Sequence, residues 1–221
     1  VVCGTGLKTI GTKAFSGNSK LNSIQLNEGL ETIGKSAFYY CRNLASVSFP
    51  NSLVAVKDKA FELSGLTSIA IPENVSELGV NIVYLSDKLQ SISVAENNTS
   101  FRAWDNVLYQ LSEDGTPYQT LAYAYASGSG TVQIAEQTEK IGHSTFYKAA
   151  KVTSVILADT IKEIGEDSFY QTNIEYIDFP ESLEKIGNTA FVGCKNLKEI
   201  HIPDQVQSIG TYAFWLCEGI K

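Results

Sequence analysis

The sequence of 221 residues contains no methionine and only two histidines, and it has no long apolar run. No window approaches the roughly 18 to 20 apolar residues that a membrane-spanning helix needs. The first residues also lack the charged start and the apolar stretch of a signal peptide. We therefore expect no membrane insertion of this segment. Because methionine is missing even at position 1, we expect a processed chain from which a leader has been removed.

Positive charge is scarce as well. The 17 lysines and arginines are outnumbered by 24 acidic residues, which gives a formal net charge of −7 and a pI near 4.9. Such a molecule repels phosphate backbones, so we expect no nucleic-acid partner.

Motifs that carry chemistry are also missing. There is no His-Glu-x-x-His, no paired Cys-x-x-Cys, no phosphate-binding glycine loop and no Gly-x-Ser-x-Gly elbow. The two histidines, His143 and His201, occupy different positions of a repeat, and we expect them to lie far apart. His143 is expected to be an exposed loop residue without a partner. We predict no enzyme activity, no metal site and no cofactor.

What the sequence does contain is a repeat. An apolar residue and Gly are followed three positions later by a small residue and Phe, as in Ile10-Gly11 with Ala14-Phe15. Successive Phe residues are 23, 23, 23, 22 and 23 positions apart within two runs, a period typical of leucine-rich repeats. The repeat Phe residues are Phe15, Phe38 and Phe61 in the first run, then Phe146, Phe169, Phe191 and Phe214 in the second.

Each repeat also carries a short stretch with the alternating pattern of a strand, often ended by Pro. We expect these ladder stretches to form parallel strands on the concave face of a solenoid. They are residues 21–26, 44–49, 66–71, 89–94, 152–157, 174–179 and 197–202. A second extended stretch leads to the Gly, which is expected to provide either a positive φ or a close backbone approach. The Phe residues should stack as a buried spine.

The predicted fold is therefore a single repeat solenoid over residues 1–221 of the leucine-rich type, α/β or mainly β. Regular coils are expected at about 1–88 and 139–221, with short helical or turn segments carrying the Phe residues. An irregular segment at about 95–138 interrupts them. Within it, residues 106–111 and 118–125 flank Asp114-Gly115, which predicts a β-hairpin, and Ser127–Gly130 is predicted to be a loop.

Three of the four cysteines share one position of the repeat. Cys41, Cys194 and Cys217 each lie three residues after a repeat Phe, at a position otherwise filled by small residues. This equivalence favours free, partly buried thiols. A disulfide between Cys194 and Cys217 stays open, because adjacent coils lie only about 5 Å apart.

The repeat resembles a known family. The frame Leu-x-x-Ile-x-Ile-Pro-x-x-Leu-x-x-Ile-Gly-x-x-Ala-Phe-x-x-Cys, followed closely by residues 181–194, is similar to that of the BspA-like leucine-rich repeat proteins. The resemblance covers most of the chain. It implies a bacterial protein that is secreted or displayed at the cell surface, with adhesive or protein-binding roles, and it brings no catalytic residues.

The outward ladder positions change character along the stack. The first coils present small, uncharged residues, whereas the last present Tyr176, Asp178, Glu199 and His201. We therefore predict that this end binds a protein ligand, such as a host extracellular-matrix protein or another surface protein. Two alternatives stay open: a glycan bound by aromatics of the irregular middle, with Trp104 foremost, and a structural spacer within a longer surface protein.

The fold prediction has a simple spectroscopic test. A stack of short strands and turns should give a far-ultraviolet circular dichroism spectrum dominated by β and turn signals. A predominantly helical spectrum would contradict it.

Overall fold

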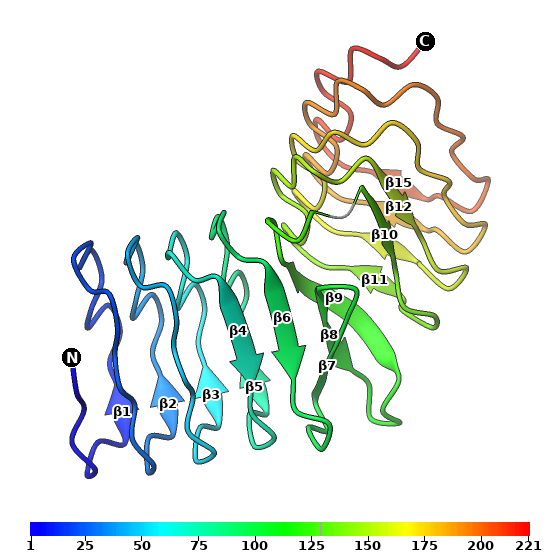
Figure 1. Cartoon of the computed structure of the whole chain (residues 1–221). Coiled ribbons are helices and arrows are strands. Elements are labelled where there is room, and N and C mark those ends of the chain that lie inside the picture. The colour runs from blue at the N-terminus through cyan, green and yellow to red at the C-terminus, as the bar shows by residue number, and fades with distance from the viewer. Residues whose placement is uncertain (129) are drawn as a thin grey trace.

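Each coil runs through two extended stretches that are joined by two turns (Figure 1). The computed structural model describes residues 1–128 and 130–221, so Ser129, in the predicted loop, lies outside the described residues. Within them, the segments that carry the repeat Phe are turns, and there is no helix. The predicted solenoid with parallel strands is confirmed. The segments for which the sequence predicts either a helix or a turn are turns.

The second extended stretches build two parallel sheets. In the first coils the strands are β1 (Thr9–Ile10), β2 (Thr32–Ile33), β3 (Ala55–Val56) and β5 (Glu77–Leu78), paired in that order. In the last coils they are β11 (Lys140–Ile141), β13 (Glu163–Ile164), β14 (Lys185–Ile186) and β15 (Ser208–Ile209). The register aligns the residue before each repeat Gly with its equivalent in the next coil, as in Ile164 with Ile186.

The predicted ladder stretches pair less extensively. Strand β4 (Ser68–Ile71) pairs with β6 (Ser91–Val94), and β12 (Ser154–Ile156) pairs with β10 (Thr131–Gln133), which the sequence did not predict. Single bridges link Gln25 to Ser48 and Ser154 to Tyr176. Residues 197–202, which the sequence predicts as a strand, form neither a strand nor a single bridge. In β4 exposed and buried residues alternate, as the pattern predicts.

The turns that carry Phe, here called the Phe turns, are bonded from coil to coil by their backbones. The Phe38 amide donates to the carbonyl of Ala60 at 2.7 Å, and the Phe169 amide donates to that of Ala190 at 2.8 Å. The residues two and six positions after the repeat Gly take a positive φ, as Asp167 and Gln171 do after Gly165. Phe rings of neighbouring coils therefore stack at 5.1–5.2 Å, which confirms the predicted spine.

The repeat Gly serves the close approach of backbones rather than a positive φ. At Gly187, an added Cβ would lie 2.6 Å from the amide nitrogen of Glu166 and 2.7 Å from the carbonyl carbon of Gly165. Its φ is not in the left-handed region, which belongs instead to Thr189, two positions later. In the first coil, Gly11 has no such neighbour.

The irregular middle is a three-stranded antiparallel meander. Its strands are β7 (Phe101–Trp104), β8 (Val107–Leu111) and β9 (Pro117–Tyr123). The predicted hairpin is β8–β9, turning at Asp114-Gly115, where Gly115 has a φ of +85°. The sequence did not predict β7, which joins β8 through Asp105 and Asn106, both with positive φ.

The meander is a joint with two buried faces. Leu108 and Ala122 pack into the core of the coils that precede it. Val107, Tyr109 and Tyr123 pack into the core of the coils that follow. Strand β9 also pairs in parallel with β11, so the meander replaces a regular strand of the second sheet. The chain thus has two hydrophobic cores that share this sheet.

The meander separates the two runs of coils at one edge only. At the Phe turns the runs touch directly, because the ring of Tyr84 lies 4.9 Å from that of Tyr147. The meander therefore acts as a wedge, and Figure 1 shows the bend that results. The inside of this bend is lined by Phe turns of both runs.

One coil within the predicted regular range of about 1–88 lacks the Phe motif. Ile82 and Val83 lie three and four positions after Gly79 and take the places of the small residue and Phe. The Phe61 amide donates to the Ile82 carbonyl at 2.8 Å, as in the other Phe turns. On the far side of the meander, Tyr123 takes the place of a Phe and contacts Phe146 with ring centroids 5.2 Å apart.

At the repeat position three residues after Phe, the cysteines donate hydrogen bonds to the preceding coil. The Sγ atoms of Cys41, Cys194 and Cys217 each donate to the carbonyl of a Phe in the preceding coil, at 3.0–3.1 Å. Ser86 makes the equivalent bond to Phe61 at 2.9 Å. The thiols are free in the structure, as the repeat position favours, and Cys194 and Cys217 are not bridged.

Glycine substitutions test the close backbone approach. Gly187→Ala should lower the free energy of unfolding by about 1–3 kcal/mol, because the new Cβ must displace backbone. Gly11→Ala, with open space and no positive φ, should change it by less than about 0.5 kcal/mol. Urea unfolding of the two variants measures the difference. Equal stabilities would contradict the role assigned to Gly187.

Thiol labelling tests the cysteine position. The hydrogen bond with Cys217 and burial both raise the pKa of Cys194, so its reactive thiolate is scarce. We expect Cys194 to react with a thiol reagent far more slowly in the native protein than in guanidinium chloride. Mass spectrometry of tryptic peptides reports both rates, and a bridged Cys194–Cys217 peptide from unreduced protein would contradict the structure.

Candidate functional site

The four predicted ligand-binding residues of the last coils lie together. Tyr176, Asp178, Glu199 and His201 are all exposed, and they line one groove of about 500 Å³. They come from two adjacent ladder stretches, whose alternate residues Ile177 and Phe179 point into the core. We call this surface the ladder groove.

The polar side chains of the ladder groove differ in how they are held. Lys198 donates to Glu175 Oε2 at 2.9 Å and to the Tyr176 hydroxyl at 3.2 Å, and these bonds raise the pKa of Lys198. Its Nζ also lies 4.9 Å from the centre of the Tyr176 ring. Tyr176 is therefore fixed in place. Asp178, Glu199 and His201 form no side-chain hydrogen bond or ion pair with any described residue.

A second groove of about 440 Å³ adjoins the first and shares Tyr176 and Asp178 with it. It adds Ile156, which is 49% exposed beside a Tyr176 that is 55% exposed. It also adds the carboxylates of Asp159 and Glu181. The combined surface therefore spans three ladder stretches and places two large apolar side chains among several acidic groups.

Trp104, the other predicted site residue, stands apart from this surface. It ends β7, is 50% exposed and pairs with Val107 across the meander. The other aromatics of the middle do not join it in a platform. Phe101, Tyr109 and Tyr123 are buried. Tyr109 is part of the scaffold, since its hydroxyl accepts a bond from the Ala135 amide at 3.1 Å and burial raises its pKa to about 12.

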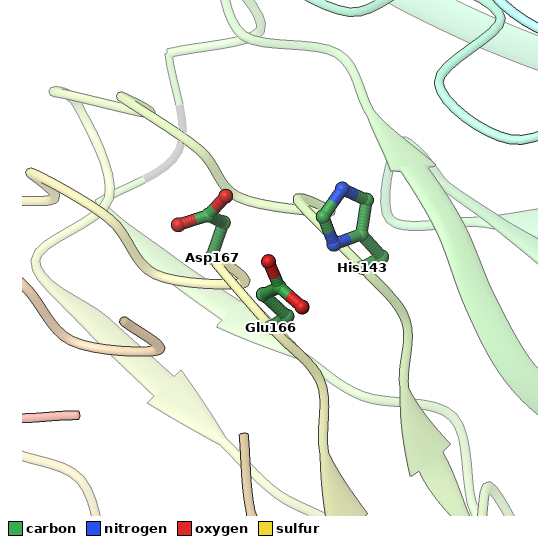
Figure 2. A group of neighbouring side chains, drawn as sticks. All are labelled: His143, Glu166 and Asp167. Atoms are coloured by element: carbon green, nitrogen blue, oxygen red, sulfur yellow. The ribbon is translucent and has the colours of Figure 1, made fainter. Parts of the chain in front are cut away.

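His143 is exposed as predicted, and no hydrogen bond or ion pair joins it to a described residue, although it has two acidic neighbours. Figure 2 shows its imidazole facing Glu166, with Asp167 beside them. Their potential ligand atoms all lie within 4.8 Å of one another. Thr189 Oγ1 also donates to Asp167 Oδ1 at 2.6 Å. The sequence held the signal for this cluster, because His143 and Glu166 occupy the same repeat position in adjacent coils.

The cluster consists of three side chains that could each offer one ligand atom to a metal ion. One imidazole and two carboxylates are donor types that a divalent transition metal accepts. His143 and Glu166 are fully on the surface, and Asp167 is half-buried. Among the described residues, no other trio of histidine, cysteine or acidic side chains is gathered in this way.

Comparison with known proteins identifies what the chain resembles. The BspA type leucine rich repeat region family matches in six copies, over residues 1–106 and 120–221. The residues between these ranges lie in the meander. No curated protein matches the chain. Of the described residues, none forms a helix that could cross a bilayer.

Solved structures agree with the family match. The chain is similar to the pneumococcal vaccine antigen PcpA, with 27% identity and a TM-score of 0.87, and it spans all of its own length and 60% of that chain. It is similar to a leucine rich cell surface protein from Faecalibacterium prausnitzii, with 26% identity, a TM-score of 0.67 and coverage of 97% and 68%. A leucine-rich repeat protein from Eubacterium ventriosum, at 19% identity, has the same fold with a TM-score of 0.80, over 100% of this chain and 64% of that one.

Proposed function

Because the chain belongs to the BspA-type leucine-rich repeat family, we propose that it is a non-catalytic binding module displayed at the bacterial cell surface. Two similar structures support this location, since one is described as a cell surface protein and the other as a vaccine antigen. The absence of a nucleophile motif from the sequence is consistent with a binding role.

The ladder groove is the binding surface in this proposal. The observation that carries it is the gathering of Tyr176, Asp178, Glu199 and His201 in one groove, three of them without an internal partner. Unpaired polar side chains on a rigid backbone can bond a partner without first breaking a bond within the protein. A half-exposed Tyr beside Ile156 adds the apolar contact typical of interface centres.

The partner is a protein with a basic segment, such as a host extracellular-matrix protein or another surface protein. Carboxylates outnumber cations along the two adjoining grooves, which contain Asp159, Asp178, Glu181 and Glu199. Charge complementarity then favours lysine and arginine on the partner. The glycan alternative at Trp104 has less support, because no aromatic ring of the described residues contacts that side chain.

Alanine substitution of the groove tests the proposal. A variant with Tyr176, Asp178, Glu199 and His201 all changed to Ala should lose at least about tenfold in affinity for the captured protein. The partner is first captured from matrix and serum proteins with the parent chain. Biolayer interferometry then measures its affinity for parent and variant at low and high salt, and high salt should weaken the parent's binding.

The matched control uses the same ladder positions in the first coils. Ser23, Gln25, Ser46 and Ser48 are exposed there, and their fourfold alanine variant should keep the parent's affinity. A groove variant that binds as the parent does, or a control that loses as much, would contradict the proposal. Failure of the parent to capture any protein would favour the spacer alternative.

A further inference from the structure

The inside of the bend holds a cleft that the ladder groove does not include. It has a volume of about 600 Å³ and is lined from both runs of coils. Leu63 comes from a Phe turn before the meander, and Arg42 and Lys88 come from the short turns that follow such turns. Tyr147 and Lys148 come from the first Phe turn after the meander. We call it the corner cleft. It exists only because the meander brings two distant runs of turns face to face.

The charge of the corner cleft is opposite to that of the molecule. Arg42, Lys88 and Lys148 line it against a single carboxylate, Asp87, in a chain of net charge −7. None of the three cations forms an ion pair with a described residue. Elsewhere nine lysines do: Lys8, Lys35, Lys57, Lys59, Lys140, Lys162, Lys185, Lys195 and Lys198. Unpaired cations from separate coils therefore converge on one concave site.

The walls of the cleft are formed in advance. Tyr147 is clamped between Tyr84, at 4.9 Å, and Tyr170, at 4.7 Å between ring centres. The backbone of Lys148 is fixed by its amide, which donates to the Tyr170 carbonyl at 2.7 Å. Arg42 lies over the Tyr40 ring, 4.3 Å from its centre. A ligand would meet Arg42 and the backbone of Lys148 already in position, which lowers the entropic cost of binding.

The neutral groups of the lining suit hydroxyl-bearing ligands. Asn43 offers an exposed amide, and the partly exposed Tyr147 offers a phenol. Burial raises the pKa of Tyr147, so its phenol is protonated at neutral pH. The ring faces of Tyr147 are already occupied by Tyr84 and Tyr170, so stacking on a ligand is not part of this chemistry.

Size and charge together select the ligand class. A cleft of this volume lies within the roughly 300–1,000 Å³ typical of small-ligand sites. Its lining differs from that of the ladder groove in its three unpaired cations. Three cations on separate turns match several anionic groups spread along a short chain. We propose that the corner cleft binds an acidic oligosaccharide, one whose sugars carry carboxylate or sulfate groups.

Calorimetric titration with defined probes tests this site. The probes are a sulfated chondroitin tetrasaccharide, a neutral chitin tetrasaccharide, inorganic sulfate and a short polyglutamate peptide. The parent chain should bind the sulfated tetrasaccharide more tightly than the other three. The double variant Lys88→Gln with Lys148→Gln, which removes one cation from each side of the cleft, should weaken that binding about tenfold or more.

A charge-matched control separates the site from the net charge. Lys13→Gln with Lys20→Gln removes two exposed lysines of the first coil that form no ion pair with a described residue, and it should leave binding unchanged. Equal weakening by the two double variants, or no binding by the parent at millimolar probe, would overturn the proposal. Equal affinity for inorganic sulfate would also overturn it and assign the cleft to simple anions. Equal affinity for the neutral sugar would assign it to neutral glycans, and preference for polyglutamate would assign it to acidic peptides.

The two binding proposals can be tested independently of each other. The corner cleft shares no lining residue with the ladder groove. The groove variant should bind the sulfated tetrasaccharide as the parent does, and the cleft variant should retain the captured protein.

Discussion

The backbone bonds between consecutive Phe turns set the spacing that every other part of the coil must fit. Each turn amide that donates to the next coil fixes the two backbones close together, and Phe rings on them then stack at 5.1–5.2 Å. That closeness leaves no room for a Cβ at positions such as Gly187. It also holds residues such as Asp167 at a positive φ, a conformation that tertiary bonding must stabilise.

The meander is the one place where the coil spacing is broken, and it determines both the shape and the sites. A sheet with two buried faces belongs to both cores, so neither run of coils is closed without it. Because it inserts at the sheet edge but not at the Phe turns, the runs tilt toward each other. The ladder groove lies on a regular part of the stack, whereas the corner cleft depends on this tilt.

Much of the fold could be predicted from the sequence because the repeat reports it directly. The spacing of Gly and Phe determines the coils, and alternation in residues 66–71 determines which side chains face outward. The gathering of Tyr176, Asp178, Glu199 and His201 follows from the same phase. Whether these residues bind a ligand stays a prediction. The position of a residue within the repeat determines where its side chain points, but it does not identify a ligand.

Other features could not be predicted from the sequence, and each has a physical reason. The turn at Asp105-Asn106 carries no glycine to mark its positive φ, so β7 was missed. Ile82 and Val83 fill a Phe turn with different side chains, so the Phe motif does not mark that coil. The corner cleft joins Lys88 to Lys148 across 60 residues and depends on a tilt that no local pattern encodes. The neighbours of His143 could have been found, had equivalent repeat positions been compared in pairs.

In the second run of coils, charges alternate over three adjacent strands. Lys140 pairs with Glu163, which also pairs with Lys185 in the next coil. Although burial acts to raise it, bonds from Lys140 and Lys185 hold the pKa of Glu163 below its ordinary value. Two identical coils in succession would instead place like charges side by side. Duplicating one of these coils alone would therefore lose a complementary contact, whereas duplicating a lysine coil together with its glutamate neighbour would keep the alternation.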